Sequence, residues 1–136
     1  ALHQKGHGVK HDAYEAARWM RRAAEQGMSE AEYDYAVMLL RGQGLNADMP
    51  KALDYLKIAA NKGIAGAQNR LAHLIVEGER LDKNLVEAAK WRLLARENGI
   101  RDDVLDKLVG RLSRADAAAA EKAAHDWREK AALELQ

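Results

Sequence analysis

The sequence predicts an all-α protein, an α-solenoid of stacked helical hairpins. Three series of residues recur every 36 positions along the 136-residue chain. They are Gly27, Gly63 and Gly99; Ala16, Ala52, Ala88 and Ala124; and Trp19, Tyr55, Trp91 and Trp127. A fixed period between about 20 and 50 residues is the signature of a stacked repeat protein. Because such proteins work through extended surfaces, the pattern favours binding over catalysis.

The composition agrees with helices and argues against several classes of function. The chain has one proline and no phenylalanine, which disfavours β-structure, and no cysteine for a disulfide or a thiolate. Its 22 basic and 21 acidic residues leave a net charge of +1, too little to predict binding to nucleic acid or to an anionic membrane. No apolar run reaches the ~18–20 residues of a membrane span, so direct membrane insertion is not expected.

One full repeat is expected over residues 31–66, as two helices joined by a glycine-rich loop. The apolar face of the first helix carries Ala31, Tyr35, Met38 and Leu39. Ser29 and Glu32 have the spacing of a capping box at its start, and Gly42 follows its last residue. Asp48 is expected to cap the second helix, which ends before Gly63.

The same pattern continues over residues 67–102 and is incomplete over residues 1–30. In the former, Asn84 with Glu87 predicts the start of the second helix. In the latter, Asp12 is expected to cap a helix over residues 13–26, after a loop at Gly6 and Gly8. Since the chain starts in the middle of the pattern, we expect it to be a fragment or a mature form of a longer protein.

The last repeat, residues 103–136, is expected to be a degenerate cap that completes a single domain over residues 1–136. Its first helix has an apolar stripe made of Leu105, Leu108, Val109 and Leu112. The loop glycines are missing, and Ser113 instead begins a long helix that runs from about Arg114 to Leu135. The outer face of that helix is charged, as in the terminal repeats of solenoids.

The aromatic residues of the second helices are expected to lie in the core. Trp19, Trp91 and Trp127 keep a fixed place on the helix face that also carries the periodic alanines. Small residues at the middle of each first helix, Ala36 and Ala72, would let the two helices of a hairpin approach closely. The periodicity favours this interpretation over stacking on a ligand.

The repeated motif resembles the Sel-one-like repeat, a branch of the tetratricopeptide superfamily. Its residues in the first repeat are Gly6, Gly8, Val9, Asp12, Ala16, Trp19, Ala23, Ala24, Gly27 and Ala31. Residues 42–67 carry the same motif with Leu45 and Tyr55 at two of its positions, and residues 78–99 carry it with Arg80 and Arg96 as departures. The resemblance covers about residues 1–103, and the period of 36 suits it better than the 34 of tetratricopeptide repeats.

The resemblance implies a right-handed superhelix of α-hairpins that scaffolds protein–protein contacts. Members are common among exported bacterial proteins, where they act as adaptors and regulators of signalling, envelope assembly or host contact. A periplasmic or exported location is therefore expected for this chain. Some members bind penicillin-like compounds, but those resemble disulfide-rich chains, and this chain has no cysteine.

Three small constellations have a structural interpretation that outweighs a chemical one. His3, His7 and His11 have the spacing of a metal site on one helix, but the glycines between them predict a solvated loop. Ser29 and Ser113, the only serines, both fit helix caps rather than nucleophiles. Glu77 and Glu79, near His73, fit a solvated helix end better than an acid–base pair. We therefore expect no catalytic residue, no metal and no cofactor.

A second apolar stripe on the first helices predicts the binding site. Tyr33, Val37 and Leu40 are spaced at i, i+4 and i+7, away from the core face. In tetratricopeptide-like arrays the first helices line the concave side, where an apolar groove suits a peptide or helix. The expected partner-binding residues are Tyr33, Val37, Leu40, Arg41, Asn69, His73 and Glu77. The alternative is that they pack on neighbouring repeats.

The sequence thus predicts a protein-interaction scaffold that binds a segment of a protein or peptide partner in a concave groove. One alternative is an enzyme or a binder of β-lactam-like small ligands on the same scaffold, which thermal-shift screening would reveal. Another is RNA binding, which calls for a basic groove that this nearly neutral chain does not predict. The sequence leaves the oligomeric state open.

Overall fold

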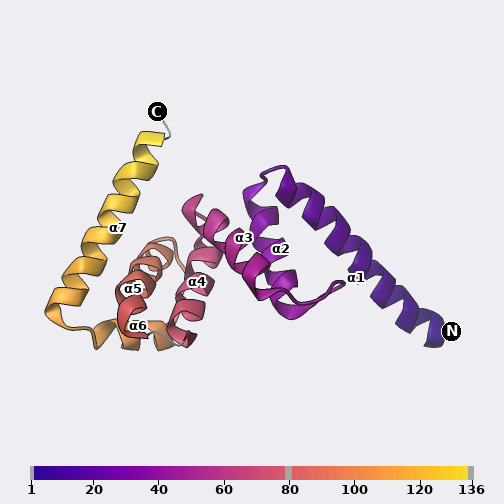
Figure 1. Cartoon of the computed structure of the whole chain (residues 1–136), viewed down its shortest axis with the longest axis horizontal. Coiled ribbons are helices and arrows are strands. Elements are labelled where there is room, and N and C mark those ends of the chain that lie inside the picture. The colour runs from indigo at the N-terminus through magenta and orange to yellow at the C-terminus, as the bar shows by residue number, and fades with distance from the viewer. Residues whose placement is uncertain (1, 79–80, 135–136) are drawn as a thin grey trace. The chain divides into compact units, whose positions relative to one another are not determined.

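Helices account for the regular structure of the described part of the chain, residues 2–78 and 81–134. Figure 1 shows the computed structural model of the chain, with its helices labelled in sequence order. They are α1 (Leu2–Glu25), α2 (Ser29–Arg41), α3 (Met49–Asn61), α4 (Ala65–Glu77), α5 (Leu81–Glu97), α6 (Asp103–Gly110) and α7 (Arg114–Glu134). The chain divides into two compact units, Ala1–Ala59 and Ala60–Gln136, which are described separately.

The periodic glycines mark the points at which one hairpin ends and the next begins. Gly27, Gly63 and Gly99 all have a positive φ, between 85° and 94°, which few residues other than glycine adopt. After α1, the Met28 N–H donates to Ala23 O and the Gly27 N–H to Ala24 O, the pair of bonds that defines a Schellman motif. The next helix begins immediately, so one glycine both ends a helix and sets the direction of its successor.

The capping box predicted at Ser29 does not form. The N-cap of α2 is Met28, which makes no side-chain capping bond, and Ser29 is already the first helical residue. Ile64 takes the same place before α4. These two apolar residues immediately follow the periodic glycines, where a Schellman motif favours an apolar side chain. The Asp48 cap is confirmed, because the Lys51 N–H donates to Asp48 Oδ1 over 3.1 Å.

The loop predicted at Gly6 and Gly8 is also wrong, because α1 runs without a break from Leu2 to Glu25. A glycine permits a helix to end but does not force it to, and costs only about 1 kcal/mol in a helix interior. At Gly42 the stop is enforced, since the loop is tied back to its helix by the Asp48 N–H, which donates to Leu39 O over 3.0 Å.

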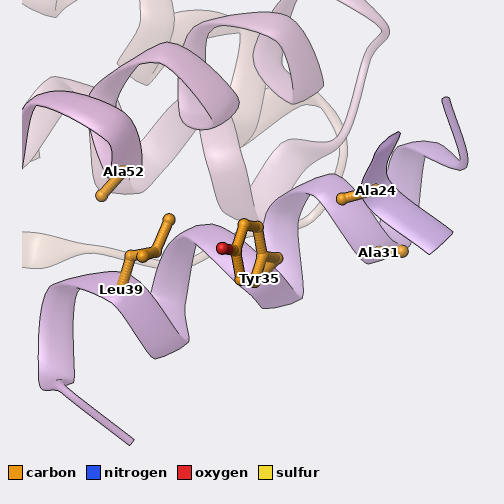
Figure 2. Packing of buried hydrophobic residues seen from close by; sticks show 5 residues of the cluster. All are labelled: Ala24, Ala31, Tyr35, Leu39 and Ala52. Carbon is orange, nitrogen blue, oxygen red and sulfur yellow. The ribbon is translucent and has the colours of Figure 1, made fainter. Parts of the chain in front are cut away.

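The core of the first unit lies where α1, α2 and α3 meet (Figure 2). Its buried members are Ala24, Ala31, Tyr35, Leu39 and Ala52. Tyr35 and Tyr55 meet edge to face with ring centroids 5.2 Å apart, an arrangement that aromatic quadrupoles favour. Ala36 is fully buried, in agreement with close approach of the two helices of the hairpin.

Trp19 is not a core residue, contrary to the prediction from its period. Its counterpart Tyr55 packs on α2, the first helix of its own hairpin. No helix of the described residues takes the corresponding place against α1, and Trp19 is therefore 65% exposed. The Arg22 guanidinium lies 5.3 Å from the centroid of its ring.

The second unit is built around α5, which packs against α4, α6 and α7. Trp91 is 3% exposed and Ala72 is fully buried, as predicted. The helix begins at Leu81, three residues before the predicted cap. The Asn84 side chain lies outside the described residues, and its backbone lies within the helix. Here Arg80 replaces the second loop glycine of the preceding repeat in the sequence.

The long terminal helix α7 covers α5, as expected of a cap. It begins at Arg114, where the Asp116 N–H donates to Ser113 Oγ over 3.1 Å. Trp127 meets Trp91 edge to face, with ring centroids 6.3 Å apart, and Ala120 and Ala124 are buried. Most of the predicted charged face is exposed, including Glu121, Lys122, Asp126, Glu129 and Lys130.

Candidate partner-binding site

The predicted site residues of the first unit follow one another along α2. Tyr33, Val37 and Leu40 are half-buried, and Arg41 is exposed. Leu40 packs against the core cluster of this unit, which gives it a structural role. Tyr33 and Val37 remain as partly exposed apolar side chains one helical turn apart, so a partner could bury more of their surface.

The predicted site residues of the second unit have a different environment. Asn69 and His73 of α4 belong to a polar network that also includes Arg92 of α5, Asp102 and Asp106. Glu77, one turn beyond His73, is exposed. The network joins three helices, and its members were not grouped by any sequence motif.

Arg92 is the centre of the network and is only 1% exposed. Its Nε donates to Asp106 Oδ1 over 2.8 Å, and its Nη2 donates to Asp106 Oδ2 over 3.3 Å. Its Nη1 donates to Asn69 Oδ1 over 2.8 Å. A buried guanidinium needs such partners, because an unpaired charge away from water is costly. The bond to Arg92 lowers the pKa of the Asp106 carboxyl.

Asp102 connects the start of α6 to α4. As the N-cap of α6, its Oδ1 accepts from the Leu105 N–H over 3.0 Å. Its Oδ2 accepts from Asn69 Nδ2 over 2.9 Å and lies 2.5 Å from His73 Nε2. Burial alone would raise the pKa of Asp102, but these hydrogen bonds and the charge of His73 lower it from 3.8 to about 2.

The register of the repeat explains why the network is polar. Arg92 occupies the position that Leu56, a fully buried residue, occupies one repeat earlier. Asn69 and His73 correspond in the same way to Tyr33 and Val37. The charged residue at a core position was therefore the one sequence signal of the network. It implies that Asn69 is polar because it must satisfy Arg92.

The Asp102 carboxylate is expected to make the fold sensitive to acid. The pKa of Asp102 is about 2 in the folded chain, and its ordinary value is 3.8. As pH falls, the Asp102 carboxylate is therefore protonated in the unfolded chain at a higher pH than in the folded chain. The stabilisation, about 2 kcal/mol, is fully present above about pH 4 and is lost as pH falls through about 2.

Urea unfolding followed by circular dichroism between about pH 5 and about pH 2 measures this effect. The Asp102→Asn variant should be less stable at pH 5 and should lose less stability on acidification. An equal loss in the variant and the parent would contradict the assignment.

Other sequence candidates yield no further site in the part of the chain that the structure describes. The side chains of His3, His7 and His11 lie outside the described residues, as does Glu79. The backbone of all three histidines lies in α1 and not in a loop. No group of three potential metal ligands occurs among the described residues. Within the same residues, no helix has the length and hydropathy of a membrane span.

These features define a helical-repeat protein, with hairpins that restart every 36 residues. The family model of the Sel1 repeat matches the chain three times, over residues 1–28, 29–64 and 65–100. The chain belongs to the Sel1 repeat family. The second and third matched repeats begin with Ser29 and Ala65, the first residues of α2 and α4.

Solved structures give the same result. A protective antigen present in uropathogenic Escherichia coli strains, with an SLR fold, is similar with a TM-score of 0.72 and 25% identity over 89% of this chain and 27% of that one. A Sel1 repeat protein from Oxalobacter formigenes is similar with a TM-score of 0.59 and 33% identity over 64% of this chain and 36% of that one. No curated protein matches the sequence significantly.

The prediction of an α-solenoid of 36-residue hairpins is thereby confirmed. Sel1 repeat proteins are generally scaffolds for protein–protein interaction, and the family is typically non-catalytic. Both solved relatives are bacterial. The chain spans about a quarter to a third of the length of these two relatives.

Proposed function

We propose that this protein is a bacterial scaffold or adaptor that binds a segment of a partner protein through the exposed parts of its first helices. The observation that carries the proposal is the pair Tyr33 and Val37 on α2. Both are apolar, only half-buried and outside the core cluster of their unit. Tyrosine is enriched among the residues that dominate binding energy at interfaces, which makes Tyr33 the expected anchor.

The residues on α4 contribute to the proposed site in two ways. His73 and Glu77 have exposed surface, with the His73 side chain 37% exposed, and can contact a partner directly. Asn69 uses its oxygen for Arg92 and its amide nitrogen for Asp102, so it acts by holding α4, α5 and α6 in place. Polar and charged groups of this kind contribute to the specificity of binding more than to its affinity.

A periplasmic or exported location, with a regulatory or envelope-associated role, completes the proposal. It is supported by the bacterial origin of both solved relatives, one of which is a protective antigen. Fractionation of cells that produce the full-length protein, followed by immunoblotting, tests the location. Recovery in the cytoplasmic fraction alone would contradict it.

Site-specific photo-crosslinking tests the binding site. A benzophenone amino acid in place of Tyr33 should capture a discrete protein in cells of the native host, which mass spectrometry identifies. The matched control places the same group at Ile58, an exposed apolar residue of α3 that is 42% exposed. Capture of the same protein with equal yield from both positions would place the binding surface elsewhere.

A further inference from the structure

A small pocket in the first unit lies between α1, α2 and the loop that follows α2. Its volume is about 120 Å³, room for a few atoms such as a carboxylate on a short aliphatic stem. The residues that line it are Tyr14, Ala17, Arg18, Arg21, Tyr35, Gly44 and Leu45. None of them is among the partner-binding residues considered above.

The lining of this pocket is suited to an anion. It contains two arginines, Arg18 and Arg21, and no carboxylate. Arg18 also lies 5.9 Å from the centroid of the Tyr14 ring, and one of its nitrogens is 3.6 Å from Glu15 Oε1. That ion pair is exposed on both sides and therefore weak, so it leaves the guanidinium available. Planar guanidinium groups pair with carboxylates through two parallel hydrogen bonds.

An open depression adjoins this pocket, and the two share Tyr14, Gly44 and Leu45 in their linings. Its volume is about 600 Å³, and it is lined by Ala13, Tyr14, Gly42, Gly44, Leu45 and Asn46. Apart from Asn46 these residues offer aliphatic carbon, an aromatic ring and backbone. Tyr14 is 53% exposed and borders both spaces. A ligand that fits both would carry an acidic group next to an apolar one.

The loop that forms one wall is held firmly against α1. Gly44 has a φ of +73°, and a Cβ placed on it would collide with the backbone of Ala13 and Tyr14. No other residue fits there, so the loop backbone lies directly on the helix backbone. The Gln43 N–H also donates to Met38 O over 3.1 Å. The pocket is therefore preformed, which reduces the entropy cost of binding.

The repeat architecture does not require the charged lining. One period later, Pro50, Asp54 and Lys57 replace Tyr14, Arg18 and Arg21. Pro50 lacks the aromatic ring of Tyr14, and Asp54 has the opposite charge to Arg18. The hairpin folds with either set, so packing alone does not account for two arginines and an exposed tyrosine at this place.

We propose that this pocket binds an acidic side chain of the protein partner, whose neighbouring apolar side chain lies in the adjoining depression. This inference rests on the proposed function in one respect, which is that the acidic group belongs to a segment of a partner protein. The partner segment thus contains a glutamate or aspartate directly beside an aliphatic or aromatic residue.

Nuclear magnetic resonance titration of the ¹⁵N-labelled 136-residue chain tests the proposal. The probe is the blocked peptide acetyl-Gly-Gly-Glu-Leu-Gly-Gly-amide, with its Glu→Gln analogue and free glutarate as comparisons. The Glu peptide should shift the Gly44 amide and the Arg18 and Arg21 Nε–H signals in a saturable way. Arg18→Gln with Arg21→Gln should weaken binding at least about tenfold, because charge-assisted hydrogen bonds are lost.

Arg22→Gln is the matched control, since Arg22 is on the same helix and does not line the pocket. It should change the affinity less than twofold. No saturable shift up to the solubility limit of the peptide, equal binding of the Gln peptide, or equal loss in Arg22→Gln would overturn the proposal. Binding of glutarate as tight as that of the peptide would also overturn it, because a free acid would then suffice.

The outcome is independent of the crosslinking test. The titration needs no native partner and uses variants on α1, whereas crosslinking probes α2. Peptide binding together with failed capture at position 33 would place the partner site in this pocket. Capture at position 33 without peptide binding would leave the scaffold function intact and remove this pocket from it.

Discussion

Replacement of Trp91 by alanine should lower the free energy of unfolding by about 3–5 kcal/mol, the range for a large buried aromatic side chain. Trp91 is 3% exposed, and its ring meets that of Trp127 edge to face. The Lys90 ammonium lies 3.9 Å from the ring centroid, and desolvation by burial lowers the pKa of Lys90. The substitution would therefore remove contacts between α5 and the terminal helix and leave a cavity.

Urea denaturation followed by circular dichroism measures this loss. Trp19→Ala is the control within the same chain, because Trp19 has the same repeat position but is 65% exposed. It should cost less than about 1 kcal/mol, as substitutions at exposed positions do. Equal losses for the two variants would contradict the different environments that the structure assigns to them.

Asp106→Ala should be about as destabilising, by about 3–5 kcal/mol. The substitution removes the carboxylate that binds two nitrogens of Arg92 and leaves the buried guanidinium with the neutral Asn69 but without an opposite charge. Arg96, which has a nitrogen 3.6 Å from Asp106 Oδ1, would lose a weaker and more exposed contact.

The double variant Arg92→Leu with Asp106→Ala separates the two causes of this loss. Leucine is the residue at the corresponding position of the preceding repeat, where Leu56 is fully buried. Since a well-packed apolar residue often replaces a buried ion pair at little cost, the double variant should recover at least half of the stability. A double variant no more stable than Asp106→Ala would show that the unpaired charge is not the source of the loss.

The period made most of the fold predictable. A glycine after each of α1, α3 and α5 and an alanine inside each of these helices recur at fixed spacing, and their structural roles depend on local backbone geometry. Gly63 and Ala52 therefore behave as the sequence predicts, with a positive φ and complete burial. Local rules of this kind can be read from one sequence.

The errors arose where a local pattern had more than one solution. The capping box at Ser29 does not form, because α2 starts immediately after a Schellman motif and Ser29 is its first residue. The glycines at positions 6 and 8 allow a turn but also fit into a helix at modest cost. Trp19 has the period of a core residue, but burial also needs a partner helix, which the period does not supply.

The candidate site was only partly predictable for a different reason. The exposure of Tyr33 and Val37 follows from their helix positions. The network around Arg92 depends on residues 14 to 33 positions apart in the chain, and spacing alone does not bring them together. A comparison of the repeats position by position does flag Arg92, because a charge replaces a buried leucine.

Isothermal titration calorimetry of the captured partner against variants of the candidate site tests the account most directly. Tyr33→Ala, Val37→Ala and His73→Ala should each weaken binding at a temperature at which every variant is folded, with Ile58→Ala as the control. The account predicts a loss of at least about 2 kcal/mol for Tyr33→Ala, as for an interface hot spot. Unchanged affinity in all three variants would contradict it and remove the first helices from the binding surface.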